Sequence, residues 1–346
     1  MSSSDLMKLG MHIVNYIGFI GAQITNSTLL ILIFTRAEKL FGSYRHVMSV
    51  FAFYSLVYTW IEILTQPLMH LHGSMFIVMM NSPMKYETWI GNDLTCLYCG
   101  SFALCIALLA AQFYYRYIAV CKPDYLILIR GGKLFLIFIP CLICFVLWTA
   151  FVHFGMGNTV EKQMFMRDVM LENYDEDITK TSFIAPMYWT VDENGDRNWR
   201  WLDIMGSSGC TCIIIVCFST IMFCAISIYK KLKDAQNIMS AKTKELNRQL
   251  FVTLTFQGIL PFLMMYSPVG LVITLPFFEV DIGRMANFCG ASAGLYPAIE
   301  PLIAIFCIKD FRRTILCKSR RRSSIKPGMS SSETRYTKEG PSSTFH

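Results

Sequence analysis

Long apolar stretches separated by polar connections constrain this chain more than any other feature. A bilayer core of roughly 30 Å is crossed by about 20 apolar residues in a helix. Seven such stretches occur, at residues 11–34, 46–70, 92–120, 134–155, 205–230, 246–275 and 284–308. A segment inside lipid must satisfy its own backbone hydrogen bonds, so each stretch predicts a transmembrane helix. The sequence therefore predicts an all-α, integral membrane bundle of seven helices.

Composition excludes a water-soluble protein. Hydrophobic residues make up 54% of the chain, charged residues 16%, and the mean hydropathy is +0.43, which is too apolar for a soluble globule. The net charge of +7 does not indicate nucleic-acid binding, because the basic residues lie in loops beside the apolar stretches and in the tail. Pro140, Pro261 and Pro268 lie within stretches and predict kinks, since membrane helices tolerate proline.

The distribution of Lys and Arg predicts the orientation. With residues 1–10 placed outside, 23 of the 31 basic residues lie on the inner side and 8 on the outer side. Cytoplasmic loops carry such an excess. We therefore expect a multi-pass plasma-membrane protein with an extracellular N-terminus and a cytoplasmic C-terminus.

The longest outer connection, residues 156–203, predicts a β-hairpin. It contains ten acidic and five basic residues, and residues 192–196 read DENGD. This turn signal of the Asn-Gly type lies between two segments rich in aromatic and β-branched residues. We expect a hairpin in the second extracellular loop that covers the bundle; a disordered acidic loop is the alternative.

The end of the chain has three parts. Residues 309–317 combine apolar and basic side chains, which predicts an amphipathic helix on the inner membrane surface. Cys317 is a candidate for palmitoylation, and an unmodified thiol is an equal alternative. Residues 318–346 are basic and then rich in serine and threonine, which predicts a disordered cytoplasmic tail.

Charged residues at membrane depth are functional candidates because they are costly there. The helical rise of about 1.5 Å per residue places Arg116 at the cytoplasmic end of the third stretch. It could pair with Glu245 or Glu300 at rest and contact a signalling partner after the helices separate; a snorkelling anchor is the alternative. Around Glu300, two prolines fall within about one helical turn, Pro297 after Tyr296 and Pro301 after Glu300. They predict an irregular helix, which could pivot or be a static kink.

A ligand pocket is expected in the outer half of the bundle, beneath the hairpin. Five residues are candidates to supply polar contacts in a mostly apolar pocket: Glu62, Ser101, Cys105, Gln257 and Ser292. For Glu62, a hydrogen bond to a neighbouring helix or a position among the lipid headgroups are the alternatives.

Enzyme and metal patterns are missing from the sequence. There is no nucleophile elbow, no phosphate-binding glycine loop, and no His or Cys spacing that a zinc site needs. We expect no enzyme activity, no cofactor and no metal.

Short motifs follow one another along the chain. Residues 113–123 read FYYRYIAVCKP, residues 246–251 LNRQLF, and residues 295–297 LYP, followed by KDFRRTI at 309–315. Together with Asn26 and the turn at residues 193–195, they resemble the Str class of nematode seven-transmembrane chemoreceptors over about residues 11–317. The resemblance implies a GPCR-like bundle, an odorant or other small-molecule ligand, a heterotrimeric G protein as partner, and a place in sensory cilia.

By the same resemblance, Arg116 takes the place of the arginine in the Asp-Arg-Tyr motif of rhodopsin-like receptors, and Tyr296-Pro297 that of the seventh-span switch. The chain departs from those receptors in several ways. Tyr115 replaces the acid before the arginine, the second outer loop has no cysteine to pair with Cys96, and the second span has no aspartate for a sodium site. The details of the switch are therefore less firmly implied than the bundle.

A ligand-gated channel or transporter with seven spans is the main alternative function. The orientation expected from the basic residues is opposite to that of the insect odorant-gated channels. A transporter would have internal repeats and several midplane charges, and neither occurs in the sequence.

Overall fold

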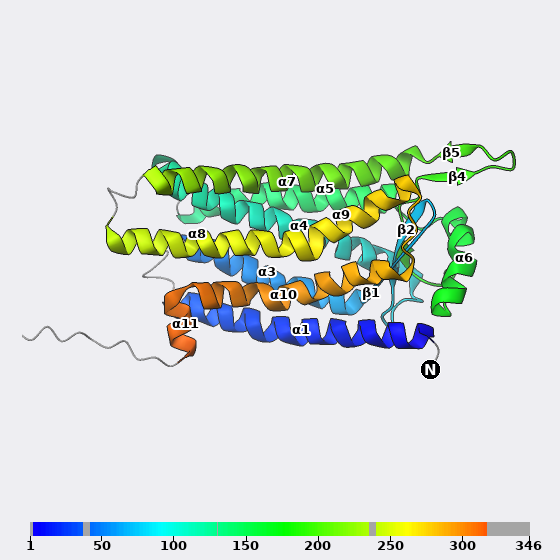
Figure 1. Cartoon of the computed structure of the whole chain (residues 1–346), viewed down its shortest axis with the longest axis horizontal. Coiled ribbons are helices and arrows are strands. Elements are labelled where there is room, and N and C mark those ends of the chain that lie inside the picture. The colour runs from blue at the N-terminus through cyan, green and yellow to red at the C-terminus, as the bar shows by residue number, and fades with distance from the viewer. Residues whose placement is uncertain (1–2, 37–41, 130, 235–239, 317–346) are drawn as a thin grey trace, which may run out of the picture.

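The protein is a bundle of long helices, seen in a computed structural model that describes residues 3–36, 42–129, 131–234 and 240–316. Within these residues, seven helices are long and apolar enough to cross a membrane, which confirms the predicted fold class (Figure 1). The spans are formed by α1 (Ser3–Arg36), α3 (Tyr44–Thr65), α4 (Thr88–Cys121), α5 (Ile139–Gly155), α7 (Trp201–Asp234), α8 (Ala241–Pro261) continued by α9 (Ser267–Thr274), and α10 (Asn287–Cys307).

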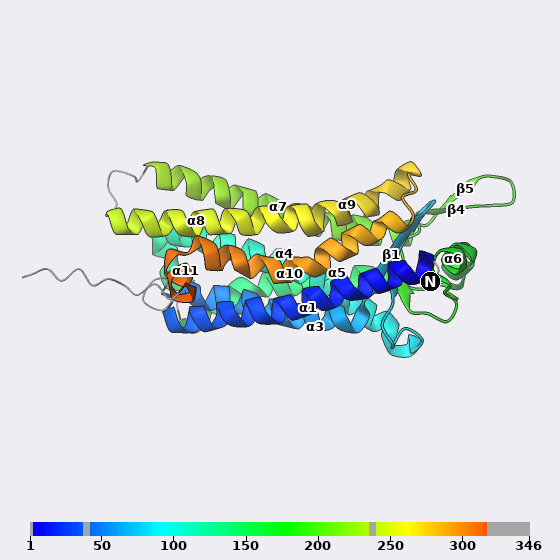
Figure 2. The same cartoon turned by 60° about the horizontal axis from the view of Figure 1, so that its bottom comes forward.

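The two ends of the bundle differ. At one end, which we call the lid end, lie β1 (Pro67–His72), β2 (Met75–Met80) and α6 (Val160–Tyr174), beside the start of α1 (Figure 1). At the other end, which we call the tail end, the short helix α11 (Lys309–Ile315) turns away from α10 (Figures 1 and 2). The palmitoylation candidate Cys317 and residues 318–346 lie outside the described residues.

Close helix packing depends on glycine at two crossings. A Cβ on Gly18 of α1 would collide with the backbone carbonyl oxygen of Gly294 in α10. A Cβ on Gly155 of α5 would lie 3.0 Å from the Cα of Gly206 in α7. Small residues at such crossings bring backbones together in lipid, where no hydrophobic effect drives helices together. The most deeply buried span is α4.

The sixth span is not a continuous α-helix. A π-helical turn, η4 (Phe262–Tyr266), separates α8 from α9, and Pro268 follows it. Proline has no N–H, so Pro268 cannot donate to the carbonyl of Met264 four residues earlier. The Ser292 hydroxyl of α10 lies 2.6 Å from that carbonyl oxygen and can donate to it. A polar side chain of the seventh span therefore replaces a backbone donor of the sixth.

In the seventh span, a carbonyl freed by proline receives its hydrogen bond from the first span. Pro301 inside α10 cannot donate to the carbonyl of Pro297. The Asn26 side chain of α1 donates to that carbonyl over 2.9 Å. Asn26 is fully buried, so the contact joins two helices away from water. Both proline sites are thus irregular but have hydrogen-bond donors from neighbouring helices.

The fourth span differs from its expected form. Two 3₁₀ segments, η1 (Pro123–Ile129) and η2 (Gly131–Phe138), precede α5, which begins at Ile139. Pro140 lies in the first turn of α5, where its missing N–H would have no helical partner in any case. It therefore starts an α-helix and does not kink one.

The lid end contains a sheet that the sequence did not predict. Strands β1 and β2 pair antiparallel, and β3 (Phe183–Ile184) pairs with β2. The second span ends at Thr65, not at residue 70, because Gln66 adopts a left-handed conformation with φ of 46° and Pro67 follows. Both strands are buried along nearly their whole length, and α6 packs Met166, Met170 and Tyr174 against them.

The predicted β-hairpin is present, but its position differs from the expected one. Strand β4 (Trp189–Val191) pairs with β5 (Arg197–Trp199) around the Asn-Gly turn, in which Gly195 has φ of 86°. Beyond Trp189 the hairpin is mostly exposed and extends away from the bundle (Figure 1). The expectation that it covers the bundle is wrong, because the charged turn stays in solvent; the three-stranded sheet and α6 form the cover.

Candidate functional site

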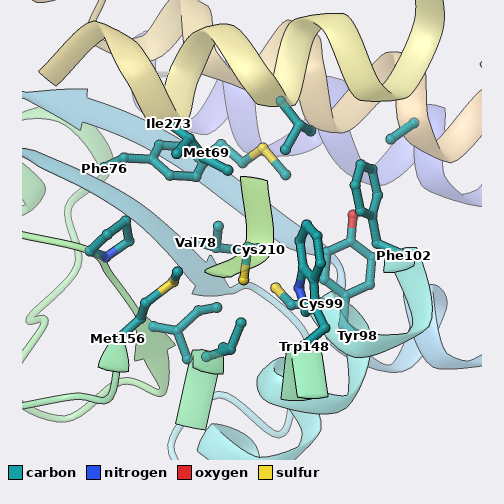
Figure 3. Close-up of a pocket in the computed structure, with 15 residues that line it drawn as sticks. Met69, Phe76, Val78, Tyr98, Cys99, Phe102, Trp148, Met156, Cys210 and Ile273 are labelled. Atoms are coloured by element: carbon teal, nitrogen blue, oxygen red, sulfur yellow. The ribbon is translucent and has the colours of Figure 1, made fainter. Parts of the chain in front are cut away.

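An apolar cavity lies directly beneath the sheet at the lid end (Figure 3). About 620 Å³ of empty space, counting any that opens to solvent, is surrounded by residues of α4, α5, α7, α9, α10 and the sheet. Its lining consists of Met69, Phe76, Val78, Tyr98, Cys99, Phe102, Trp148, Val152, Met156, Ile184, Pro186, Cys210, Val269, Ile273 and Ala293. Only about 60 Å³ of this space can hold the centre of a water-sized sphere, so the cavity is tight. Its apolar lining suits a small, mostly apolar molecule.

The cover of the cavity is joined to the sixth span. Strands β1, β2 and β3 supply Met69, Phe76 and Ile184 to the cavity wall. The Tyr188 hydroxyl, in the segment after β3, donates to the carbonyl of Ile273 over 2.7 Å. Its ring stacks on Phe277 with centroids 3.8 Å apart. Movement of α9 would therefore disturb the cover, and movement of the cover would disturb α9.

Aromatic rings connect the cavity with the π-helical turn. Trp148 packs against Phe102 at a centroid distance of 5.9 Å, and both line the cavity. Phe102 in turn meets Tyr266, the last residue of η4, edge to face at 4.8 Å. The Tyr266 hydroxyl donates to the Phe102 carbonyl over 3.4 Å. A molecule that displaced Phe102 would act on the irregular turn of the sixth span.

Ion pairs tie the cover to the helix ends. Glu176, which follows α6, accepts hydrogen bonds from Lys8 at 2.5 Å and Lys85 at 2.6 Å. Burial by itself would raise the pKa of Glu176, but the two lysine ammonium groups outweigh it and hold the pKa below its ordinary value. The carboxylate is therefore charged at neutral pH. It joins the start of α1, the segment before α4 and the end of α6 at one point.

A second ion-pair cluster holds the other end of α6. The Lys162 ammonium lies 2.5 Å from the Asp203 carboxylate at the start of α7, and Arg200 lies 3.1 Å from the same carboxylate. Burial lowers the pKa of Lys162, and Asp203 opposes that shift. Asp203 also accepts from the Met187 backbone N–H over 3.2 Å. The cover is thus fixed to the bundle on two sides.

The five ligand candidates from the sequence lie elsewhere in the bundle interior. Glu62, Ser101, Cys105 and Gln257 are all buried, and the lining of the lid-end cavity includes none of the five candidates. Gln257 donates to Glu300, and Ser292 contacts Met264 as described above. One Glu62 carboxylate oxygen has no hydrogen-bond partner among the residues the structure covers. Sequence reasoning chose polar residues, whereas this cavity is lined by aromatic residues, methionines and aliphatics that look like ordinary packing.

At the tail end, Arg116 lies where the sequence placed it, but without an acid. Its guanidinium donates to the Asn247 side chain of α8 over 3.2 Å and lies 5.2 Å from the centroid of the Tyr44 ring. No carboxylate of the described residues forms an ion pair with it. Glu245 is instead near Arg248, at 3.4 Å on its own helix. The hydrogen-bond partner of Arg116 in this structure is therefore an amide and not a carboxylate.

Arg116 lines a second hollow. About 870 Å³ of empty space, counting any that opens to solvent, is bordered by Arg116, Tyr44, Tyr115 and the 3₁₀ segment η1. Arg116 itself is only 7% exposed, and α8 holds its guanidinium through Asn247. The arrangement is one in which separation of two helices would uncover a cation.

Between the two ends, the fully buried Glu300 connects the sixth and seventh spans through its contact with Gln257. Tyr296 and Pro297, one turn earlier in α10, are also buried. Of these three residues, Glu300 faces α8 and the Pro297 carbonyl faces Asn26 of α1. Among the described residues, no group of three or more His, Cys, Asp or Glu is arranged to hold a metal ion.

Comparisons with known proteins agree with this geometry. Residues 11–316 match the family described as "Serpentine type 7TM GPCR chemoreceptor Str". The chain is 31% identical to a Caenorhabditis elegans protein described as "Serpentine receptor class r-10", over 89% of this chain and 91% of that protein. It is 25% identical to the C. elegans "G-protein coupled receptor str-33", over 85% of this chain and 86% of that one. Squid rhodopsin shares the fold, with a TM-score of 0.56, 16% identity, and coverage of 92% and 87% of the two chains.

Proposed function

Because the chain belongs to the Str family of serpentine seven-transmembrane chemoreceptors, we propose that it binds a small odorant or other small molecule at the lid end and signals to a heterotrimeric G protein at the tail end. One observation carries the proposal: an apolar cavity and a buried arginine beside a hollow lie at opposite ends of one bundle. A receptor needs both a site for its ligand and a separate surface for its partner.

We propose that the lid end is extracellular and the tail end cytoplasmic. The excess of Lys and Arg in the connections and tail of one side supports this orientation. Arg312 and Arg313 of the short helix α11 are among these residues. The family resemblance extends the proposal to the membrane of a sensory cilium. Epitope tags on the two termini of intact cells test it: staining of a C-terminal tag without permeabilisation would reverse the orientation.

The sixth span is the proposed moving part. Val269 and Ile273 of α9 line the cavity, and Tyr266 of the π-helical turn contacts its floor residue Phe102. A ligand shifts a conformational equilibrium only through a difference in affinity for the two arrangements. Contacts with α9 and Phe102 offer that difference, because both adjoin the irregular turn. In the signalling arrangement, α8 moves from α4 and Arg116 loses Asn247.

The contact of Gln257 with Glu300 is the proposed second element of the switch. It joins α8 to α10, so movement of α8 must change or break it. Tyr296 and Pro297 belong to the same irregular part of α10, whose Pro297 carbonyl depends on Asn26 of α1. Glu245 is exposed on α8 near Arg248, a position in which it would face the partner directly.

Expression in reporter cells, with calcium and cyclic-nucleotide readouts, tests this function. An odorant panel is applied to cells that express the receptor and to matched cells without it. Arg116→Ala is expected to abolish the response while surface expression persists. Lys180→Ala is the control, because Lys180 is exposed at the lid end, away from the proposed partner surface, and pairs with Asp177 three residues away. A full response with Arg116→Ala, or a ligand-gated current that needs no G protein, would overturn the proposal.

A further inference from the structure

The chemistry of the lid-end cavity restricts the kind of molecule it accepts. None of its fifteen lining residues carries a formal charge. Transfer of an ammonium or a carboxylate from water into such surroundings is very costly unless an opposite charge awaits it. The cavity is therefore built for an uncharged molecule whose surface is mostly apolar.

One polar group in the wall lacks a partner. The Trp148 side chain is 3% exposed, and its indole Nε1–H has no hydrogen-bond partner in the described part of the chain. Indole nitrogen is a donor only, and a buried tryptophan N–H normally finds an acceptor. An unpaired donor retains the full cost of its desolvation. A cavity wall with such a donor is complementary to an acceptor supplied from within the cavity.

The position of the indole is fixed by its surroundings. Figure 3 shows the Trp148 ring in the cavity wall, beside Cys99 and next to Tyr98. Its other neighbour, Phe102, packs against it at 5.9 Å. At Gly100, a Cβ would collide with the side chain of Thr149, so α4 and α5 are in close contact one residue away from Trp148. The donor is thus held in place before any ligand arrives.

The other polar atoms of the lining do not require the ligand to supply a hydrogen-bond acceptor. The Tyr98 hydroxyl can donate or accept, so it tolerates either kind of ligand group. The thiols of Cys99 and Cys210 are weak donors and weak acceptors. Only Trp148 has a strict requirement, and that requirement is for an acceptor.

We propose that the cavity binds a neutral, mostly apolar molecule with a hydrogen-bond-accepting oxygen or nitrogen, and that this atom accepts from the Trp148 Nε1–H. Trp148 is then the residue that sets ligand specificity. The inference rests on the proposed function, because it takes the lid-end cavity as the ligand site. A cationic ligand held over the aromatic rings is the competing chemistry, and it would leave the indole N–H unpaired.

The experiment uses the purified full-length receptor in lipid nanodiscs, with ¹⁵N in the tryptophan indoles. The chain has six tryptophans, so the Trp148 resonance is assigned as the one that Trp148→Phe removes. Four probes of equal size are compared: methyl pentanoate, octane, heptylammonium and hexanoate. We expect methyl pentanoate to shift the Trp148 indole proton downfield and to bind more tightly than the other three.

The variant Trp148→Phe tests the role of the indole N–H directly. Trp148→Phe retains an aromatic ring but loses the donor, so it should weaken methyl pentanoate by about three- to tenfold and leave octane unchanged. Trp60→Phe is the matched control, since Trp60 is 54% exposed on α3 and outside the cavity. Tighter binding of heptylammonium or hexanoate, an unmoved Trp148 resonance with every probe, or an unchanged ester affinity in Trp148→Phe would overturn the inference.

The outcomes separate this inference from the proposed function. If methyl pentanoate binds as expected but no bound probe triggers a G-protein response, the ligand chemistry stands and the signalling proposal fails. If the receptor signals to a charged agonist that Trp148→Phe does not affect, signalling stands and the ligand chemistry fails.

Discussion

Ser292→Ala should destabilise the bundle because it removes the donor that serves the proline-freed carbonyl of Met264. The two oxygens are 2.6 Å apart and join α10 to the π-helical turn. Side-chain hydrogen bonds between membrane helices contribute about 0.6 kcal/mol on average and up to about 1.7 kcal/mol. Since Pro268 leaves this carbonyl without its helical donor, we expect a value in the upper half, about 1 kcal/mol. For a chain of this size that corresponds to a melting temperature lowered by roughly 2 °C.

A double-mutant cycle separates this bond from general packing. In Pro268→Ala the backbone gains an N–H that can donate to Met264, so Ser292→Ala should then cost far less. The assay is thermal unfolding of a fluorescently tagged receptor in detergent, followed by size-exclusion chromatography. Thr255→Val is the control, because among the described residues that hydroxyl bonds to the carbonyl of Phe251 on its own helix. An equal loss from Ser292→Ala with and without Pro268 would refute the reasoning.

Further predictions concern the first span and the cover. Asn26→Leu should lower the melting temperature to a similar extent, since its amide donates to the Pro297 carbonyl at 2.9 Å; an unchanged melting curve would contradict this. Glu176 has a folded pKa below its ordinary value of 4.5, so its contribution to stability is present above that value and is lost as the pH falls through the lowered pKa. Melting curves measured against pH should therefore decline at acid pH in the wild type. Glu176→Gln should be less stable at neutral pH and decline less, and parallel curves would exclude the ion pairs as the cause.

The helical bundle could be predicted from the sequence because lipid imposes a length on apolar segments. The lid sheet could not, since β1 and β2 are buried on both faces. Such strands show no alternation and continue the apolar run of the preceding helix. The change is marked by Pro67, directly after a residue with positive φ, and by Gly73, which has φ of 53° in the turn between the two strands. The isolated hairpin with its Asn-Gly turn was predicted correctly because its strands are short and its turn is exposed.

The candidate site could be predicted only in part. The tail-end position of Arg116 followed from helix length. Its partner Asn247 did not, because an uncharged amide at the second residue of the expected sixth span gives no signal in the sequence. The lid-end cavity was missed for a different reason. Its wall contains Phe102 and Met69, whose spacing on helix or strand is the same whether they face a cavity or fill the core.

Prolines explain why polar residues were poor markers of the cavity. A carbonyl freed by proline in a membrane helix must find a donor inside the bundle, since lipid offers none. Here Ser292 and Asn26 supply those donors, so two polar side chains of the spans have structural partners already. A polar group therefore marks a ligand site only when it is buried and has no hydrogen-bond partner within the bundle. Trp148 satisfies that condition in the cavity wall, and it looked like core packing in the sequence because tryptophan counts as apolar.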